Sequence, residues 1–245
     1  MIFSKFYAEC YDQIHSSKSY DGESAKMLKY LETNLGKIGI YRILDFGCGT
    51  GIHLNSLLDE KLELYGYDRN EYMLDVARQN YPDLFVTSDY AKIPGELDLV
   101  YSLFDVVNYQ VSDEEIEVFF RALASKLAQG ATLVVDGWHY SGVAQDPPET
   151  RERNILFESS TITRRVTPTT SNNYRTTVLD ITLENKSQSE MLTHESHIMR
   201  AFDAPELEMF AKSCGFTGVS FKDGRDWDKD LEPDSWRFVM FAEKA

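Results

Sequence analysis

The chain has 245 residues, of which 42% are hydrophobic and 27% are charged, values that are typical of a globular protein and argue against intrinsic disorder. Its formal net charge of −15 repels phosphate backbones, so DNA or RNA is not an expected partner. Three widely spaced cysteines argue against disulfides or a metal site, and the opening segment MIFSKFYAECYDQIH lacks the apolar run of a signal peptide or membrane span, so we expect a cytoplasmic protein.

The predicted elements begin with a helical cap over residues 1–40, in which Met27 and Leu31 recur at helical spacing. Residues 41–140 follow as a cofactor-binding core, where apolar runs alternate with amphipathic stretches in the rhythm of parallel βαβ units. The expected strands are YRILDF, LELYGYD, LFVTSD, ELDLVYSLF and ATLVVDGW. A long helix, DEEIEVFFRALASKLAQG, is expected to end at Gly130, before the fifth strand.

The rhythm changes after the fifth strand. Residues 141–152 are polar and contain prolines, which predicts a loop. From about 153 to 200 the chain is rich in Thr, Ile and Val with period-two stretches such as SSTITRRVT, which are typical of antiparallel strands. We expect this segment to form an antiparallel insertion over the acceptor site. Residues 204–245 should add a final helix and two strands, giving a mostly parallel, seven-stranded α/β sheet.

A glycine-rich turn follows the first strand. The segment DFGCGTG places Asp45, Gly47, Cys48, Gly49 and Gly51 between that strand and its helix. Its glycines permit left-handed backbone conformations and the close approach of a ligand. Open α/β sheets bind ligands at the carboxyl ends of their strands, where this turn lies. The spacing G-x-G-x-G, led by an aspartate, differs from the dinucleotide fingerprint G-x-G-x-x-G and favours S-adenosylmethionine (SAM).

Two further aspartates end the second and third strands. Asp68 can accept hydrogen bonds from two ribose hydroxyls, as acidic residues at this place do for nucleosides in related architectures. Asp89 can accept a hydrogen bond from an adenine amino group. Together with the glycine turn, they predict a SAM site rather than a nicotinamide site or a fold without a cofactor.

This pattern resembles the class I SAM-dependent methyltransferases, and DFGCGTG is close to that family's first motif. A finer resemblance, to the nucleotide-amino-sugar N-methyltransferases of antibiotic biosynthesis, rests on several short segments. These are YAE and YD within residues 7–12, the glycine turn, LF at 103–104, Trp138 and HESH at 194–197. The resemblance implies a Rossmann-like class I methyltransferase fold, SAM as the cofactor, S-adenosyl-L-homocysteine as its product, and no metal.

The resemblance also assigns roles in the cofactor site. Tyr11 and Tyr20 would close over the methionine end of SAM, Asp89 and Tyr90 would hold the adenine, and Leu103 would lie just past the fourth strand. The full set of expected cofactor-binding residues is Tyr11, Tyr20, Asp45, Gly47, Cys48, Gly49, Gly51, Asp68, Met73, Asp89, Tyr90 and Leu103.

Two side chains are candidate catalytic residues. Tyr109 follows the fourth strand and His139 follows the fifth, near the place where the methyl group should emerge. A hydroxyl acceptor would need a base within hydrogen-bond reach, whereas an amine must only be neutral and desolvated. Histidine titrates near neutrality, so His139 is the better candidate base. The resembled enzymes carry a histidine where this chain has Tyr109, which leaves the acceptor chemistry open.

The expected substrate-binding residues are Phe3, Trp138, Arg165 and His197. Arg164 and Arg165 are alternative contacts for a pyrophosphate, because neighbours on a strand face opposite sides. For the same reason, at most one of His194 and His197 can face the site. The resembled enzymes have a tyrosine near the position of Phe3 and a second tryptophan in place of His139.

The predicted activity is the transfer of a methyl group from SAM to an amine, or to a hydroxyl, of a nucleotide-linked sugar. The stretch FDVVNYQ, also found in relatives of surface-polysaccharide synthesis, is compatible with a sugar acceptor. The alternatives are a methyltransferase with a non-sugar acceptor and a SAM-binding protein without catalysis. We expect a small-molecule partner, no membrane partner, and a monomer or homodimer.

Overall fold

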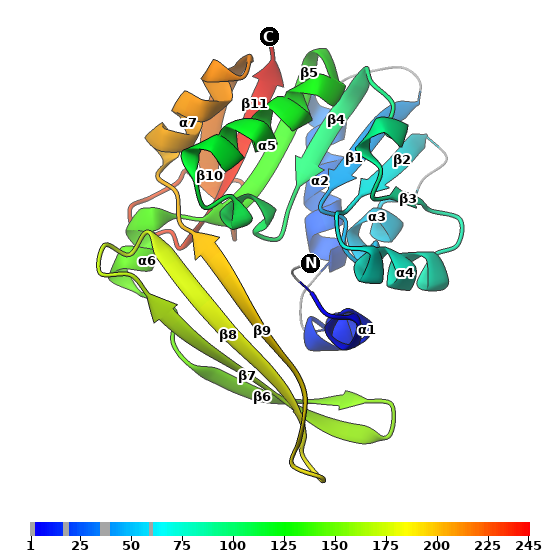
Figure 1. Cartoon of the computed structure of the whole chain (residues 1–245). Helices are drawn as coiled ribbons and strands as arrows, with labels where there is room; N and C mark the ends of the chain where they lie inside the picture. The colour runs from blue at the N-terminus through cyan, green and yellow to red at the C-terminus, as the bar shows by residue number, and fades with distance from the viewer. Residues whose placement is uncertain (1–2, 17–19, 35–39, 59–60) are drawn as a thin grey trace.

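The computed structural model of the chain describes residues 3–16, 20–34, 40–58 and 61–245. Seven strands form the main sheet in the order β10-β11-β5-β4-β1-β2-β3 (Figure 1). Their bounds are β1 Tyr41–Phe46, β2 Leu62–Tyr67, β3 Phe85–Thr87, β4 Leu97–Ser102, β5 Leu127–Trp138, β10 Phe216–Asp223 and β11 Arg237–Lys244. Strands β1 to β5 are parallel, and β11 is antiparallel to both of its neighbours. The predicted mostly parallel, seven-stranded sheet is confirmed.

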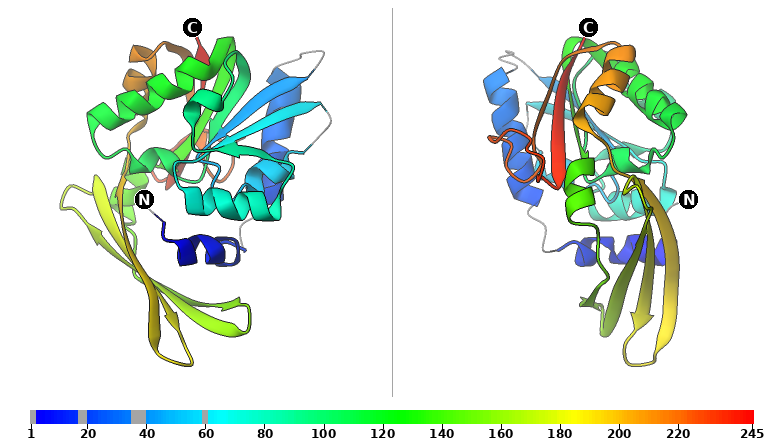
Figure 2. Two further views of the ribbon diagram at one scale, coloured as in Figure 1. Left: turned by 45° about the vertical axis from the view of Figure 1, so that its right-hand side comes forward. Right: turned by 90° about the vertical axis from the view of Figure 1, so that its left-hand side faces the viewer.

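Helices cover both faces of this sheet (Figure 2). They are α1 Lys5–Ile14, α2 Tyr20–Asn34, α3 Ile52–Ser56, α4 Glu71–Asn80, α5 Asp113–Lys126, α6 Tyr140–Gln145 and α7 Ala204–Ser213, with single 3-10 turns η1 Tyr90–Lys92 and η2 Val106–Tyr109. Phe120 of α5 and Phe210 of α7 pack with Leu44 on one face, and Met27 of α2 packs with Ile43 on the other, as strand alternation requires. Within the described ranges, no helix is long and apolar enough to cross a membrane.

A second, antiparallel sheet lies between α6 and α7 in the sequence. Its strands are β6 Arg151–Phe157, β7 Ser160–Thr170, β8 Thr176–Asn185 and β9 Glu190–Arg200, paired in that order. Helix α1 lies between this sheet and the carboxyl ends of the main-sheet strands (Figure 1). It buries Tyr7, Cys10 and Ile14 in one cluster with Ile162 and Ile181 of the second sheet. The predicted antiparallel insertion is therefore confirmed.

Two local predictions are wrong. The segment 141–152 is not all loop, because α6 forms there and packs closely on a distant part of the chain. A side chain at Gly142 would place its Cβ only 2.4 Å from the carbonyl oxygen of Ser235, so the glycine permits this approach. Strand β5 begins earlier than predicted, at Leu127, because that residue pairs with Leu97 of β4 and the tertiary pairing ends the preceding helix.

Candidate active site

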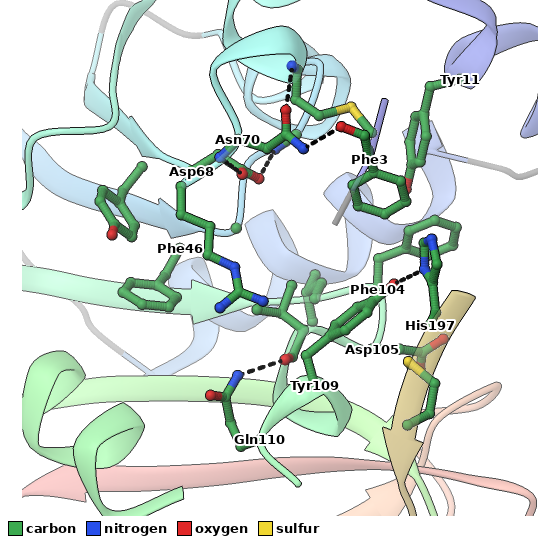
Figure 3. A pocket seen from close by; sticks show the side chains of 18 of the residues that line it. Phe3, Tyr11, Phe46, Asp68, Asn70, Phe104, Asp105, Tyr109, Gln110 and His197 are labelled. Atoms are coloured by element: carbon green, nitrogen blue, oxygen red, sulfur yellow. Dashed lines mark hydrogen bonds between the residues drawn. The ribbon is translucent and has the colours of Figure 1, made fainter. Parts of the chain in front are cut away.

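One cavity, of about 460 Å³, runs from the carboxyl ends of the main-sheet strands to the space between α1 and the antiparallel sheet. Its cofactor end is lined by the glycine turn and by the segments that follow β2, β3 and β4. Its other end, termed the acceptor end because the acceptor is expected there, is lined by side chains of α1, β7, β8 and β9. Figure 3 shows the side chains that meet in this cavity. A ligand at one end can therefore contact a ligand at the other without crossing solvent.

The glycine turn opens onto the cavity at its cofactor end. Gly47 and Gly49 both have positive φ, of 89° and 54°. A Cβ at Gly47 would lie 2.5 Å from Cγ2 of Val106, whereas nothing lies within 4 Å of a Cβ placed at Gly49. Gly47 is thus required for packing within the protein. Gly49 borders open cavity space, which leaves room for a ligand close to the backbone.

Asp68 organises this turn and also faces the cavity. Its Oδ2 accepts from the backbone N–H of Gly49 at 2.9 Å, and its Oδ1 accepts from the backbone N–H of Asn70 at 2.8 Å. Burial raises the pKa of Asp68, because the loss of hydration outweighs these two hydrogen bonds. Each carboxylate oxygen can accept a further hydrogen bond. The site therefore has a partly desolvated acceptor that suits ribose hydroxyls.

Aromatic rings line the cavity beyond Asp68. The ring centroids of Phe46 and Tyr67 lie 5.0 Å apart, and those of Tyr67 and Tyr90 are also 5.0 Å apart. The hydroxyl of Tyr90 donates to the carbonyl of Ala122 at 2.7 Å, so its ring is the part left to contact a ligand. This arrangement fits a planar group such as adenine. Sequence analysis missed Phe46 and Tyr67, although each is the last residue of its strand and adjoins an aspartate of the predicted site.

The predicted cofactor residues fall into four groups. Those that line the cavity are Tyr11, Gly47, Gly49, Asp68, Met73, Tyr90 and Leu103. Those that are buried around the turn, outside the lining, are Asp45, Cys48 and Gly51. Asp89 is exposed, and its carboxylate accepts from the backbone N–H of Ala91 at 3.1 Å, which caps η1 instead of reaching the cavity. Tyr20 begins α2, and its side chain lies outside the described residues.

Hydrogen bonds near both ends of helix α1 hold it over the cavity. The side-chain amide of Asn70 donates to the carbonyl of Phe3 at 2.9 Å, and the same side chain caps α4. The hydroxyl of Thr50, in the glycine turn, donates to Asp12 at 2.6 Å. These contacts bring the rings of Phe3 and Tyr11 over the cavity (Figure 3). The sequence marks Asn70 only as a residue that favours a helix N-cap, and it gives no signal of the contact with Phe3, 67 positions away.

The acceptor end contains three of the four predicted substrate-binding residues. Phe3, Trp138 and His197 line the cavity. Arg165 does not, because β7 directs it to the other face, where it pairs with Glu152 at 2.6 Å. The alternative, Arg164, lines the cavity instead and donates to the hydroxyl of Tyr7 at 3.3 and 3.2 Å. The backbone alternation thus favours Arg164 over Arg165.

The two candidate catalytic residues differ in position. Tyr109 lines the cavity, and its hydroxyl lies 2.9 Å from Nδ1 of His197 (Figure 3). Burial raises the pKa of the Tyr109 phenol far above its ordinary range, so the group is neutral. His139 is outside the lining and only 7% exposed, with Nδ1 2.9 Å from the carbonyl oxygen of Ser235. His139 therefore packs against the segment before β11 and does not reach the acceptor end.

The turn after β4 holds two non-glycine residues in left-handed conformations. Phe104 and Asp105, both in the cavity lining, have φ of 71° and 68°. Such conformations are costly and persist where the surroundings fix them. Arg237 donates to Asp105 at 3.0 Å and to Asp136 at 2.9 Å, and Asp136 also accepts from the backbone N–H of Asp105. A strained turn is thus held rigidly where the two ends of the cavity meet.

Comparisons with known proteins agree with this geometry. A family model for the methyltransferase domain matches residues 43–130, from β1 into β5. YqeM of Bacillus subtilis, whose name gives only the class methyltransferase, is 26% identical over 223 residues, which are 88% of this chain and 87% of that protein. The dTDP-4-amino-2,3,4,6-tetradeoxy-D-glucose N,N-dimethyltransferase of Saccharopolyspora spinosa is 26% identical over 144 residues, which are only 57% of each chain.

Solved structures show the same fold over nearly the whole chain. A SAM-dependent methyltransferase from Clostridium acetobutylicum has a TM-score of 0.80 at 18% identity, with 98% of both chains covered. SAM-bound CalS10, an amino pentose methyltransferase from Micromonospora echinaspora, has a TM-score of 0.75 at 19% identity, with 100% of this chain and 99% of that one covered. Residues 43–130 therefore match a methyltransferase domain model, and the chain has the fold of the class I SAM-dependent methyltransferases.

Proposed function

We propose that this protein transfers a methyl group from SAM to the amine of a nucleotide-linked amino sugar. The observation that carries the proposal is that one cavity is lined both by Gly49 and Asp68, where SAM is expected, and by Tyr109, where an acceptor is expected. SAM already contains its leaving group, so alignment of acceptor and methyl supplies much of the acceleration. The amino-sugar dimethyltransferase among the relatives supports the class of acceptor.

The aromatic lining favours an amine over a hydroxyl. Phe3, Tyr7, Tyr11, Phe104, Tyr109 and Trp138 all line the cavity. Aromatic faces attract cations, and both the sulfonium of SAM and a methylated ammonium product carry a positive charge. A methylated hydroxyl is neutral and gains nothing from these rings. The buried Tyr109 phenol is neutral, so by itself it is not the strong base that a sugar hydroxyl would need.

A pair of arginines supports a nucleotide diphosphate on the acceptor. Arg153 of β6 and Arg164 of β7 are directly opposite in the antiparallel ladder, so their side chains share a face. Arg153 is exposed and outside the cavity lining, and partial desolvation and the neighbouring Arg164 charge lower its pKa, which is consistent with two positive charges near each other. Among the described residues, no carboxylate forms an ion pair with either guanidinium. A pyrophosphate would supply the missing negative charge.

The nucleotide part of the proposal can be tested by calorimetry. S-adenosyl-L-homocysteine-loaded protein is titrated with dTDP, and Arg153→Gln and Arg164→Gln should each weaken binding about tenfold. Arg165→Gln is the matched control, because Arg165 pairs with Glu152 on the opposite face and should leave the affinity unchanged. Absence of dTDP binding to the unmodified protein, or equal losses in all three variants, would reject a nucleotide-bearing acceptor.

A further inference from the structure

A buried chain of hydrogen bonds leads away from the acceptor end of the cavity. The hydroxyl of Tyr109 lies 2.9 Å from Nδ1 of His197, and Nε2 of the same ring lies 3.1 Å from Glu195. The other carboxylate oxygen of Glu195 accepts from the backbone N–H of Ser4 at 2.7 Å. His197 and Glu195 are only 3% and 7% exposed. The chain thus begins at a cavity-lining phenol and ends at a carboxylate that is shielded from water.

The direction of each hydrogen bond depends on the tautomer of His197, and an ionised Glu195 selects one of the two. An ionised Glu195 can only accept, so Nε2 of His197 must carry the ring proton. In a neutral ring Nδ1 is then an acceptor, and the Tyr109 hydroxyl must donate to it. The oxygen lone pairs of Tyr109 remain available on the cavity side. Tyr109 can therefore receive a hydrogen bond from a ligand while it gives its own to His197.

We propose that Tyr109, His197 and Glu195 form a proton relay that deprotonates the ammonium form of the acceptor before methyl transfer; this proposal rests on the proposed function. One N–H proton of the acceptor moves to the Tyr109 oxygen while the Tyr109 proton moves to Nδ1 of His197. The freed nitrogen lone pair then forms the N–CH3 bond, and the electron pair of the broken S–CH3 bond stays on sulfur. Tyr109 would be the catalytic residue, with His197 and Glu195 as positioning residues that act through it.

The surroundings support a concerted transfer. Burial makes a free Tyr109 phenolate unfavourable, so its proton must leave as another arrives. The imidazolium formed on His197 would face the Glu195 carboxylate, and a buried cation is tolerable only beside such a partner. The other charged or titratable groups that act on Tyr109 are Tyr7 from α1, Asp105 from the turn after β4, and Arg69 after β2. Arg164 from β7 contacts Tyr7.

The relay predicts a ring tautomer that can be measured without turnover. In 15N-labelled protein, long-range 1H–15N correlation spectra should show His197 protonated at Nε2 and unprotonated at Nδ1. The assignment is made by comparison with His197→Gln, in which that set of signals disappears. A proton on Nδ1 of the neutral ring would overturn the relay, because Tyr109 could not then donate to it.

Steady-state kinetics of variants test whether the relay contributes to turnover. With SAM and dTDP-3-amino-3,6-dideoxyglucose, Tyr109→Phe and His197→Gln should lower kcat about a hundredfold, and Glu195→Gln about tenfold. The affinity for SAM should stay within about twofold in all three. The control is His194→Gln, on the opposite face of β9 with its ring half exposed, which should turn over normally. In the relay variants, kcat should keep rising with pH beyond the point where the wild type levels off, since only bulk solvent then removes the proton.

The outcomes separate the two proposals. If all three variants turn over as fast as the wild type and keep its pH profile, the relay is rejected and the proposed function still stands. A wild type that methylates no amino-sugar nucleotide would reject the proposed function, and with it the role of the relay. A merely structural role would lower kcat without moving the pH profile, which also counts against the relay.

Discussion

The carboxylate of Asp68 accepts a hydrogen bond from the backbone N–H of Gly49 at 2.9 Å, joining the end of β2 to the turn after β1. The same carboxylate lines the cavity. One side chain thus both shapes the glycine turn and offers acceptors to a ligand. Substitution of Asp68 should therefore weaken ligand binding more than substitution of any other aspartate at a strand end.

Asp68→Ala should weaken SAM binding by about 1–3 kcal/mol, because ribose hydroxyls lose a charged acceptor and the turn loses its anchor. Isothermal titration calorimetry measures the change. Asp89→Ala is the matched control, since Asp89 also follows a strand but is exposed and only caps η1. Similar losses in both variants would contradict this assignment of the ribose site.

Alanine at Gly47 should mainly lower stability, whereas alanine at Gly49 should mainly weaken SAM binding. Gly47→Ala meets Val106 at 2.5 Å and should cost about 1–3 kcal/mol in the free energy of unfolding. Gly49→Ala meets no protein atom and should cost only about 1 kcal/mol of left-handed strain, but its methyl group would occupy cavity space and weaken SAM binding. Urea unfolding and calorimetry, taken together, distinguish the two. A larger stability loss at Gly49 than at Gly47 would be inconsistent with this packing.

His139→Ala should lower stability without affecting turnover. The buried ring contacts the carbonyl of Ser235, so its removal leaves a buried acceptor unpaired, at a cost of about 1–3 kcal/mol. Because His139 is outside the cavity lining, kcat and SAM affinity should stay within about twofold of wild type. A hundredfold loss of kcat in a variant of normal stability would restore His139 as a candidate base.

Asp12 should make stability depend on pH. Burial raises its pKa above the ordinary value of 3.8, and the hydrogen bonds from Thr50 and Asn80 offset this only in part. A raised folded-state pKa gives a contribution that is fully present below pH 3.8 and is lost as the pH rises through the raised value. Asp12→Asn cannot ionise, so it should gain stability relative to wild type as the pH is raised through this window. Urea unfolding across that range measures the difference, and a constant difference would contradict the expectation.

Much of the fold and the cofactor end could be predicted because their signals are local. The glycine turn, its leading aspartate and Asp68 lie at strand ends that the apolar rhythm marks in the sequence. Asp89 also follows a strand, yet its side chain caps η1, because the three-residue 3-10 turn that begins directly after it offers a backbone N–H. Strand ends therefore identify candidate residues, and the conformation of the following turn decides which of them reach the cavity.

The acceptor end could not be predicted to the same depth because its contacts are long-range. Sequence analysis treated Arg164 and Arg165 as alternatives and chose Arg165, whereas the register of β7 directs Arg164 into the cavity. Tyr109 and His197 are 88 positions apart, and Ser4 and Glu195 are 191 apart, so nothing in the sequence joins them. Folding of the antiparallel sheet and docking of α1 bring these residues together.

The central claim is tested most directly by the mass of the product. The protein is incubated with SAM and with dTDP-3-amino-3,6-dideoxyglucose, dTDP-glucose or a simple phenol, and each acceptor is then analysed by high-resolution mass spectrometry. We predict that only the amino sugar gains the mass of one or two CH2 groups, with fragmentation placing them on nitrogen and one S-adenosyl-L-homocysteine released for each methyl group transferred. Methylation of dTDP-glucose or of the phenol, with the amino sugar unchanged, would contradict the claim, as would tight SAM binding with no methylated product.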